Sequence, residues 1–208
     1  GLEASAIEPA GAVPDAALTA RLDGPAAAVD GDRGRRLLAA LSPLAGDASG
    51  VQVEARLLRQ GCAPNPPARL GFPPAAQRLD LMAPPPLHHC DVVYVRIDNR
   101  AASARDVSPL YVDAEGGVVG LALSPDDDVR LEAGQSRYIA LRLVTRDAQG
   151  RPLARGVERL ALVIAPAGER RLDLRGLAGP ALMRGADAAP PLDRQGLAAQ
   201  VFAWRVED

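Results

Sequence analysis

From Asp91 onward, short runs of alternating apolar residues follow one another along the chain, separated by residues typical of tight turns. Residues 113–117 (DAEGG) and 124–128 (SPDDD) are two such turns, and the glycines of the first suit a hairpin that needs positive φ. Short strands at this spacing predict a mainly β fold, an antiparallel immunoglobulin-like β-sandwich. We expect its strands at residues 92–97, 107–112, 118–123, 129–131, 138–144, 158–164 and 197–206.

One of these segments should lie in the middle of a sheet. Residues 158–164 place leucine and isoleucine on one face of the strand and alanine and valine on the other. A strand that is apolar on both faces is covered on both sides. We therefore expect this segment to be a central strand.

The chain before this region predicts a smaller α+β part. Residues 51–57 alternate like a half-buried strand, and residues 17–22 resemble a shorter one. Four leucines share one face of a predicted helix that Asp30 or Asp32 would cap: Leu37, Leu38, Leu41 and Leu44. We divide the chain into a flexible linker or cut end (1–16), a small strand–helix–strand segment (17–60), a proline-rich connection (61–89) and the β-sandwich with a C-terminal docking strand (90–208).

The charge and hydropathy of the chain exclude two classes of partner. The chain carries 24 basic and 26 acidic residues, a net charge of −2, and no basic block. Nucleic-acid-binding domains present a basic face, so we expect no nucleic acid as a partner. No run of apolar residues is long enough to cross a bilayer, so we also expect no membrane span.

Few residues could support catalysis, and we expect that this chain is not an enzyme. Nucleophilic catalysis needs a serine or cysteine beside a base, and the only two histidines, His88 and His89, directly precede Cys90. Neighbouring side chains point apart in an extended segment, which argues against a dyad of His89 and Cys90. A hydrolase built on these three residues is therefore the least favoured hypothesis.

No metal or cofactor is expected. A zinc site needs at least three protein ligands, so Cys62 would have to join His88 and Cys90. The consecutive aspartates at 126–128 lack the alternate spacing of a calcium-binding EF-hand loop and predict a solvated turn instead.

Cys62 and Cys90 are the only cysteines, and they stand near the two ends of the proline-rich connection. A disulfide between them would stabilise the fold by ~3 kcal/mol in the chain-entropy model and would imply an oxidising compartment, such as the periplasm. The alternative is a pair of unrelated reduced thiols. The sequence leaves the compartment open between the periplasm and the cytoplasm, and a disulfide between Cys62 and Cys90 would favour the periplasm.

The C-terminal segment carries an unusual amount of apolar surface for a chain in which aromatic residues make up only 3%. Phe202, Trp204 and Val206 share one face of the predicted strand. A terminal strand of this kind must dock, either by completing the sandwich or by binding a neighbour. We expect these three residues to form a docking surface.

Four motifs of the second half share an order with a known family. They are DVVYVRIDN at 91–99, LYVD at 110–113, VRLEAGQ at 129–135, and GVERL at 156–160 followed by VIA at 163–165. This order resembles the region that follows the peptidase domain in bacterial caspase-like (clan CD, metacaspase-related) cysteine peptidases. The resemblance covers about residues 90–180, under half of the chain.

The resemblance implies a non-catalytic accessory module whose parent is a cysteine peptidase with a His–Cys dyad upstream. Such a module would dock on the peptidase, position substrate or bind a partner protein. The family's His-Gly and Asp-x-Cys-x-Gly segments have no counterpart here, so no catalytic role passes to Cys62 or Cys90. The alternative hypothesis is a stand-alone protein-binding module of a secreted or periplasmic envelope protein, with Cys62 bonded to Cys90.

Overall fold

The computed structural model describes residues 27–46, 50–59, 61–62, 71–123, 126–147, 149–178 and 196–207. Within them the chain is mainly β. The elements, in chain order, are α2 (Ala27–Leu41), η1 (Ser42–Leu44), β1 (Val51–Leu58), β2 (Gln77–Leu79), β3 (Val92–Asn99), β4 (Arg105–Val112), β5 (Val118–Gly120), β6 (Arg130–Leu131), β7 (Ser136–Arg142), β8 (Gly156–Pro166), η2 (Arg175–Ala178) and β9 (Ala198–Val206).

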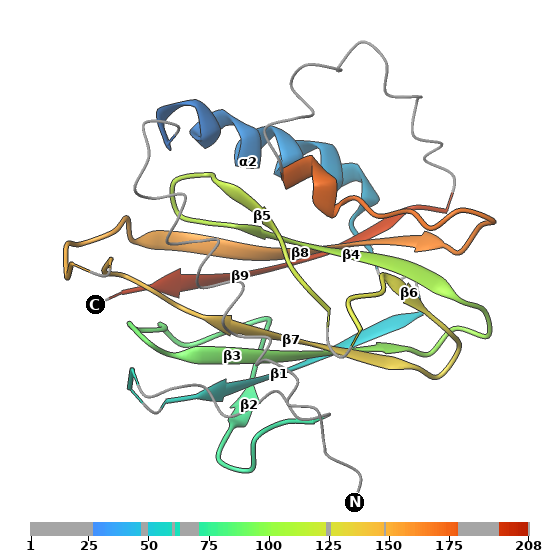
Figure 1. The fold of residues 1–208 in the computed structure, drawn as a ribbon, viewed down its shortest axis with the longest axis horizontal. Helices are drawn as coiled ribbons and strands as arrows, with labels where there is room; N and C mark the ends of the chain where they lie inside the picture. Colours follow the sequence, from blue (N-terminus) through green and yellow to red (C-terminus); the bar gives the residue numbers. More distant parts are fainter. Residues whose placement is uncertain are drawn as a thin grey trace, which may run out of the picture.

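The strands form two antiparallel sheets, as the alternating segments predicted. One sheet has the order β2-β1-β3-β7, and the other has the order β5-β4-β8-β9, with β6 also paired to β4. Figure 1 shows the two sheets as separate layers, with α2 beyond the second. Among the described residues, no helix combines the length and hydropathy needed to cross a bilayer.

The main core lies between the two sheets. Side chains alternate between the faces of a strand, so every second residue of β3 and β8 points inward. Val93, Val95 and Ile97 from one sheet thus share a cluster of fully buried side chains with Leu160 and Leu162 from the other. Burying each such side chain contributes about 1.5–3 kcal/mol, so this cluster is the main apolar contribution to folding.

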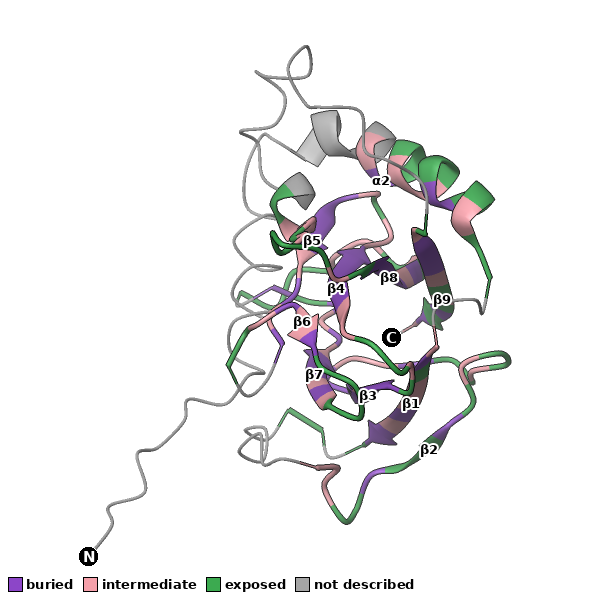
Figure 2. Ribbon diagram, turned by 90° about the vertical axis from the view of Figure 1, so that its right-hand side faces the viewer, coloured by how far each residue is buried: buried purple, intermediate pink, exposed green. Residues whose placement is uncertain are grey.

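Helix α2 covers the outer face of the sheet that contains β8 (Figure 2). Leu41 is buried there against Leu110, Val163 and their neighbours, with Leu37 and Leu38 packed beside it. The predicted leucine face is therefore present, although Leu44 lies in η1. Neither Asp30 nor Asp32 is the N-cap, because the helix begins upstream of both, at Ala27.

Gly34 lets this helix approach the sheet closely. Its N–H donates a hydrogen bond of 2.9 Å to the main-chain oxygen of Gly116, in the turn between β4 and β5. A Cβ atom on Gly34 would lie only 2.6 Å from that oxygen and from Val112 Cγ1. A larger residue at this point would therefore push the helix off the sheet.

The proline-rich segment does not divide the chain into two packing units. All eight residues of β1 pair with β3, from Val51 opposite Asn99 to Leu58 opposite Val92. β2, inside the predicted connection, pairs with β1 as well. The two-sheet core therefore includes residues before position 61, which corrects the predicted boundary; residues 1–16 and the predicted strand 17–22 lie outside the described ranges.

The predicted central strand is confirmed. β8 lies between β4 and β9 and pairs with both. Leu160, Leu162 and Ile164 face the main core, whereas Ala161 and Val163 face α2. Its two apolar faces are thus explained by the two layers that cover it.

Candidate functional site: an open sheet edge and a disulfide cluster

A groove runs along the side of the molecule where β9 ends one sheet and the first half of β1 ends the other. The Gln200 side-chain Nε2 donates a hydrogen bond of 2.9 Å to the main-chain oxygen of Val51 and so joins the two sheets at this side. The groove consists of two hollows of about 760 and 580 Å³. Both are lined by Gln52, Val53, Met82 and Phe202, which makes them neighbours.

Exposed apolar side chains gather in this groove. Met82 is 88% exposed and Val201 is 40% exposed, whereas most large apolar side chains of the described residues are buried. Phe202 is partly exposed and also packs against the main core. This arrangement offers a partner apolar contacts without any rearrangement of the core.

The edge of β9 that faces away from β8 has no main-chain partner among the described residues over the same stretch. At its two ends, the oxygen of Ala199 accepts a 3.4 Å hydrogen bond from Gly46 N–H, and that of Arg205 accepts a 2.9 Å bond from Leu87 N–H. Every second residue of a strand turns its peptide groups to the same side, so Val201 and Ala203 face this edge too. Within the described ranges, no main-chain group outside β8 pairs with these two residues.

The other end of the groove is polar and balanced in charge. The Arg96 guanidinium contacts Glu54 at 2.9 Å and Asp98 at 3.2 Å, and Arg100 contacts Asp98 at 3.3 Å. Ser136 Oγ donates a further hydrogen bond of 2.5 Å to Asp98. This end therefore has no large net charge to attract a strongly charged ligand.

The predicted docking surface is only partly available. Trp204 and Val206 are each 2% exposed and belong to the main core, because β9 completes its own sheet instead of binding a neighbour through that face. Phe202 alone reaches the groove. Docking through all three residues is thus contradicted by the burial of Trp204 and Val206, whereas Phe202 and its neighbour Val201 stay accessible.

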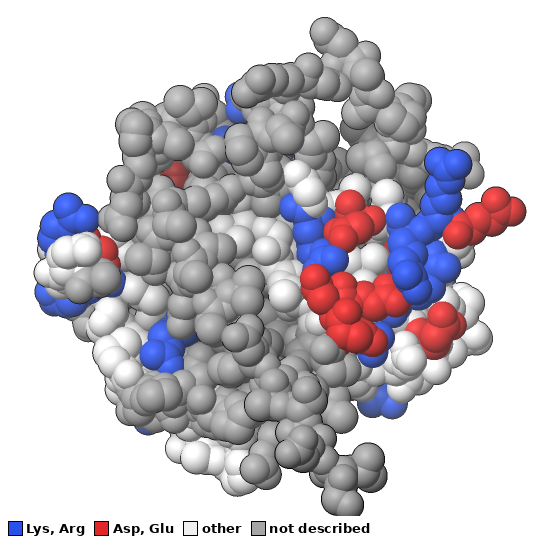
Figure 3. Space-filling model, in the orientation of Figure 1, with Lys and Arg blue, Asp and Glu red and all other residues white. Residues whose placement is uncertain are grey.

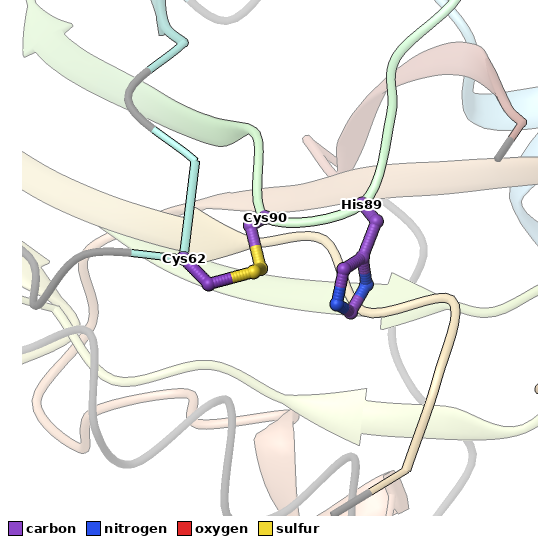
Figure 4. Close-up of side chains that lie close together, drawn as sticks. All are labelled: Cys62, His89 and Cys90. Atoms are coloured by element: carbon purple, nitrogen blue, oxygen red, sulfur yellow. A yellow bond between two sulfur atoms is a disulfide. The ribbon is translucent and has the colours of Figure 1, made fainter. Parts of the chain in front are cut away.

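Cys62 and Cys90 are joined by a disulfide, with their Cα atoms 4.9 Å apart. Cys90 is buried, whereas Cys62 is exposed. Figure 4 shows the His89 imidazole beside the bonded sulfurs. The sulfur atoms and one imidazole nitrogen lie within 4.8 Å of one another, and no other group of three such side chains with metal-ligand spacing occurs in the part of the chain that is described.

A turn at Cys90 brings these side chains together. Cys90 has φ of 66°, in the left-handed region, so the segment is not extended as we expected from the sequence. His89 and Cys90 therefore do not point apart. His88 instead uses its main-chain N–H, which donates a 2.9 Å hydrogen bond to Asp91 Oδ2, and it does not belong to the cluster.

Glu158 is a carboxyl group buried at one end of the main core. It is 7% exposed, accepts a hydrogen bond from the Tyr111 hydroxyl, and lies opposite Trp204 in the strand pairing. Burial raises the pKa of Glu158 to about 7, although the Tyr111 hydrogen bond lowers it in part. This side chain is largely closed off from solvent and lines neither of the two hollows of the groove.

The aspartate run at 126–128 is neutralised by arginines. Asp126 accepts a 3.2 Å hydrogen bond from Arg137, Asp127 pairs with Arg175, and Asp128 contacts Arg171 at 2.9 Å. Figure 3 shows acidic and basic side chains intermixed on this face. Charge balance of this kind suits a structural turn, since the carboxylates already have cationic partners.

Comparison of the chain with protein-family models, with curated proteins and with solved structures gives no match.

Proposed function

We propose that the two sheets form an immunoglobulin-like β-sandwich and that the chain is a non-catalytic module that binds an extended segment of a partner protein. The open edge of β9 carries this proposal. An incoming strand would pair with the peptide groups of Val201 and Ala203, and its side chains would contact Met82 and Phe202. Adding a strand to an exposed sheet edge is a common mode of peptide recognition, in which main-chain hydrogen bonds supply affinity and flanking pockets supply specificity.

Two further observations support two alternative settings for this module. The motif order in residues 91–165 supports an accessory module of a caspase-like cysteine peptidase, which would dock on the peptidase or position its substrate. The bonded pair of Cys62 and Cys90 favours the alternative, a protein-binding module of a secreted or periplasmic envelope protein. Both settings use the same edge, and a protein is the partner in each.

The test uses peptides selected against the folded chain from a displayed library of unstructured sequences. Bound peptides should slow amide hydrogen exchange at Val201 and Ala203, because a paired edge is protected from solvent. Val201→Glu should weaken binding at least tenfold, since it places a charge against the apolar groove.

Val157→Glu is the matched control, because Val157 is 39% exposed and Val201 is 40% exposed. Val157 lies near the start of β8, pairs with Arg205 of β9 and lines neither hollow of the groove. Binding should be unchanged in this variant. Selected peptides whose exchange footprint lies away from β9, or a library that yields none, would contradict the proposal.

A further inference from the structure

The strongest feature outside the groove is the disulfide with its adjacent imidazole. We propose that Cys62–Cys90 is a thiol-exchange site, at which a small thiol bonds to Cys62 and Cys90 leaves as a thiolate stabilised by His89. This inference does not depend on the proposed binding of a protein partner. It rests on three properties of the site: unequal exposure, the tautomer of His89, and a main chain that stays in place when the bond opens.

Unequal exposure determines which sulfur is attacked. Cys62 is exposed, whereas Cys90 is only 4% exposed. A thiolate attacks a disulfide along an accessible direction, and the rate depends on which sulfur it can reach. Attack therefore occurs at the sulfur of Cys62, and Cys90 is the leaving group.

The hydrogen bonding of His89 suits a leaving thiolate. Its Nδ1 accepts a 3.1 Å hydrogen bond from the main-chain N–H of the buried Thr145. A neutral imidazole whose Nδ1 is an acceptor carries its proton on Nε2. Figure 4 shows one ring nitrogen turned toward the bonded sulfurs, and because Nδ1 is engaged by Thr145 we assign this nitrogen as Nε2. An N–H at this place donates to a thiolate and makes it a better leaving group.

The same tautomer argues against a metal site. A histidine that binds a metal normally donates its second N–H to a neighbouring acceptor. Here the second nitrogen faces an N–H donor, that of Thr145. The cluster therefore suits a thiolate better than a cation.

The exchange consumes two equivalents of the small thiol and needs no other reactant. The thiolate of the small thiol forms a new S–S bond to Cys62, and the Cys62–Cys90 bond breaks. The electron pair of that bond goes to the sulfur of Cys90, which becomes the thiolate. A second equivalent of the thiol then releases Cys62 and yields the oxidised form of the small thiol, with both cysteines reduced.

The main chain around Cys90 is held independently of the disulfide. Cys90 N–H donates a 2.8 Å hydrogen bond to the oxygen of Leu143, and Leu143 N–H returns a 2.9 Å bond to the oxygen of Asp91. Leu87 N–H also donates a hydrogen bond to the oxygen of Arg205, and the Leu87 oxygen accepts one from Glu207 N–H, just past the end of β9. The Cys90 side of the site should therefore keep its position when the bond is broken, so that exchange does not require unfolding.

The experiment incubates the full oxidised chain with glutathione at neutral pH, then traps free thiols by alkylation and locates both modifications by mass spectrometry. Glutathione should be found on Cys62 and the alkyl group on Cys90. His89→Ala should slow the exchange about tenfold, the effect of losing one hydrogen bond to a charged group. His88→Ala is the matched control and should leave the rate unchanged, since His88 lies outside the cluster.

A second measurement separates a role in thiolate stabilisation from a merely structural one. In a Cys62→Ser chain, the ultraviolet absorbance of the Cys90 thiolate, followed against pH, should move to higher pH when His89 is also replaced by alanine. Glutathione on Cys90, equal rates with and without His89, or an exchange rate that rises in step with unfolding by denaturant would each overturn the proposal.

Discussion

Glu158 is the residue whose chemistry depends most on where it is buried. Its pKa is raised from 4.5 to about 7, first by burial and then by the nearby charge of Asp113, while the Tyr111 hydroxyl acts in the opposite direction. The folded chain therefore holds a proton at this carboxyl group at pH values where the unfolded chain has lost it. Folding is linked to the uptake of one proton over this range.

We predict that the free energy of unfolding falls as the pH rises between 4.5 and 7. Below this window Glu158 is protonated in both states and its contribution is fully present; above it that contribution is lost. The total change is ~3 kcal/mol at 1.36 kcal/mol per pKa unit. Urea unfolding at several pH values measures it, and Glu158→Gln, which cannot ionise, should make the curve flatter across this window. An unchanged curve in that variant would place the titrating group elsewhere.

At the level of single residues, the sequence indicates which cysteines can pair, but it does not indicate which other side chains lie beside them. The spacing of Cys62 and Cys90 suggested a disulfide as one of two alternatives, and the structure joins them. The sequence did not predict the place of His89 beside them, because that depends on a left-handed φ at Cys90. Cysteine rarely adopts this conformation, and no glycine or asparagine marks the turn.

Gly34 illustrates how one position fixes the place of an element. Glycine within a helix is less stable than alanine by about 1 kcal/mol, yet at this position any Cβ would meet the turn at Gly116. We predict that Gly34→Ala destabilises the fold by about 2 kcal/mol, although alanine is the better helix former. Thermal or chemical unfolding measures the change.

Ala39→Gly serves as the control, because Ala39 lies on the exposed side of the same helix. It should destabilise by about 1 kcal/mol through helix propensity alone. Helix propensity alone would make Gly34→Ala stabilising and Ala39→Gly destabilising. Both substitutions lower stability only if close packing decides the effect at position 34. A stabilising effect of Gly34→Ala would contradict the observed approach of α2 to the sheet.

The strands were predictable from the sequence because alternation directly reports which side chains face a core. The ends of the strands were less predictable: in the segment expected at 118–123, the strand covers only Val118–Gly120. The partner of β1 could not be predicted, since a half-buried strand before a proline-rich segment carries no information on where it pairs. Alternation gives the face of a strand, whereas pairing depends on contacts distant in the sequence.

At the scale of the whole molecule, the described strands before and after the proline-rich segment pair in the same sheet and share one core. β1 is an inner strand of its sheet and contributes Val51, Ala55 and Leu57 to the main core. We predict that a fragment of residues 90–208 does not fold, because it lacks β1 and exposes both the core and the edge of β3. Circular dichroism and dispersion of amide NMR signals, compared with the full chain, test this. A folded fragment would restore the division that we first expected at residues 61–89.

The edge of β9 is bordered at both ends by main-chain partners, Gly46 and Leu87. Their acceptors, Ala199 and Arg205, lie six residues apart on the strand, or about 20 Å at ~3.3 Å per residue. Fibrils grow when long, flat edges stack copy upon copy, and proteins commonly interrupt such edges to prevent it. An edge interrupted in this way can accept one short guest strand but cannot serve as a template for unlimited polymerisation.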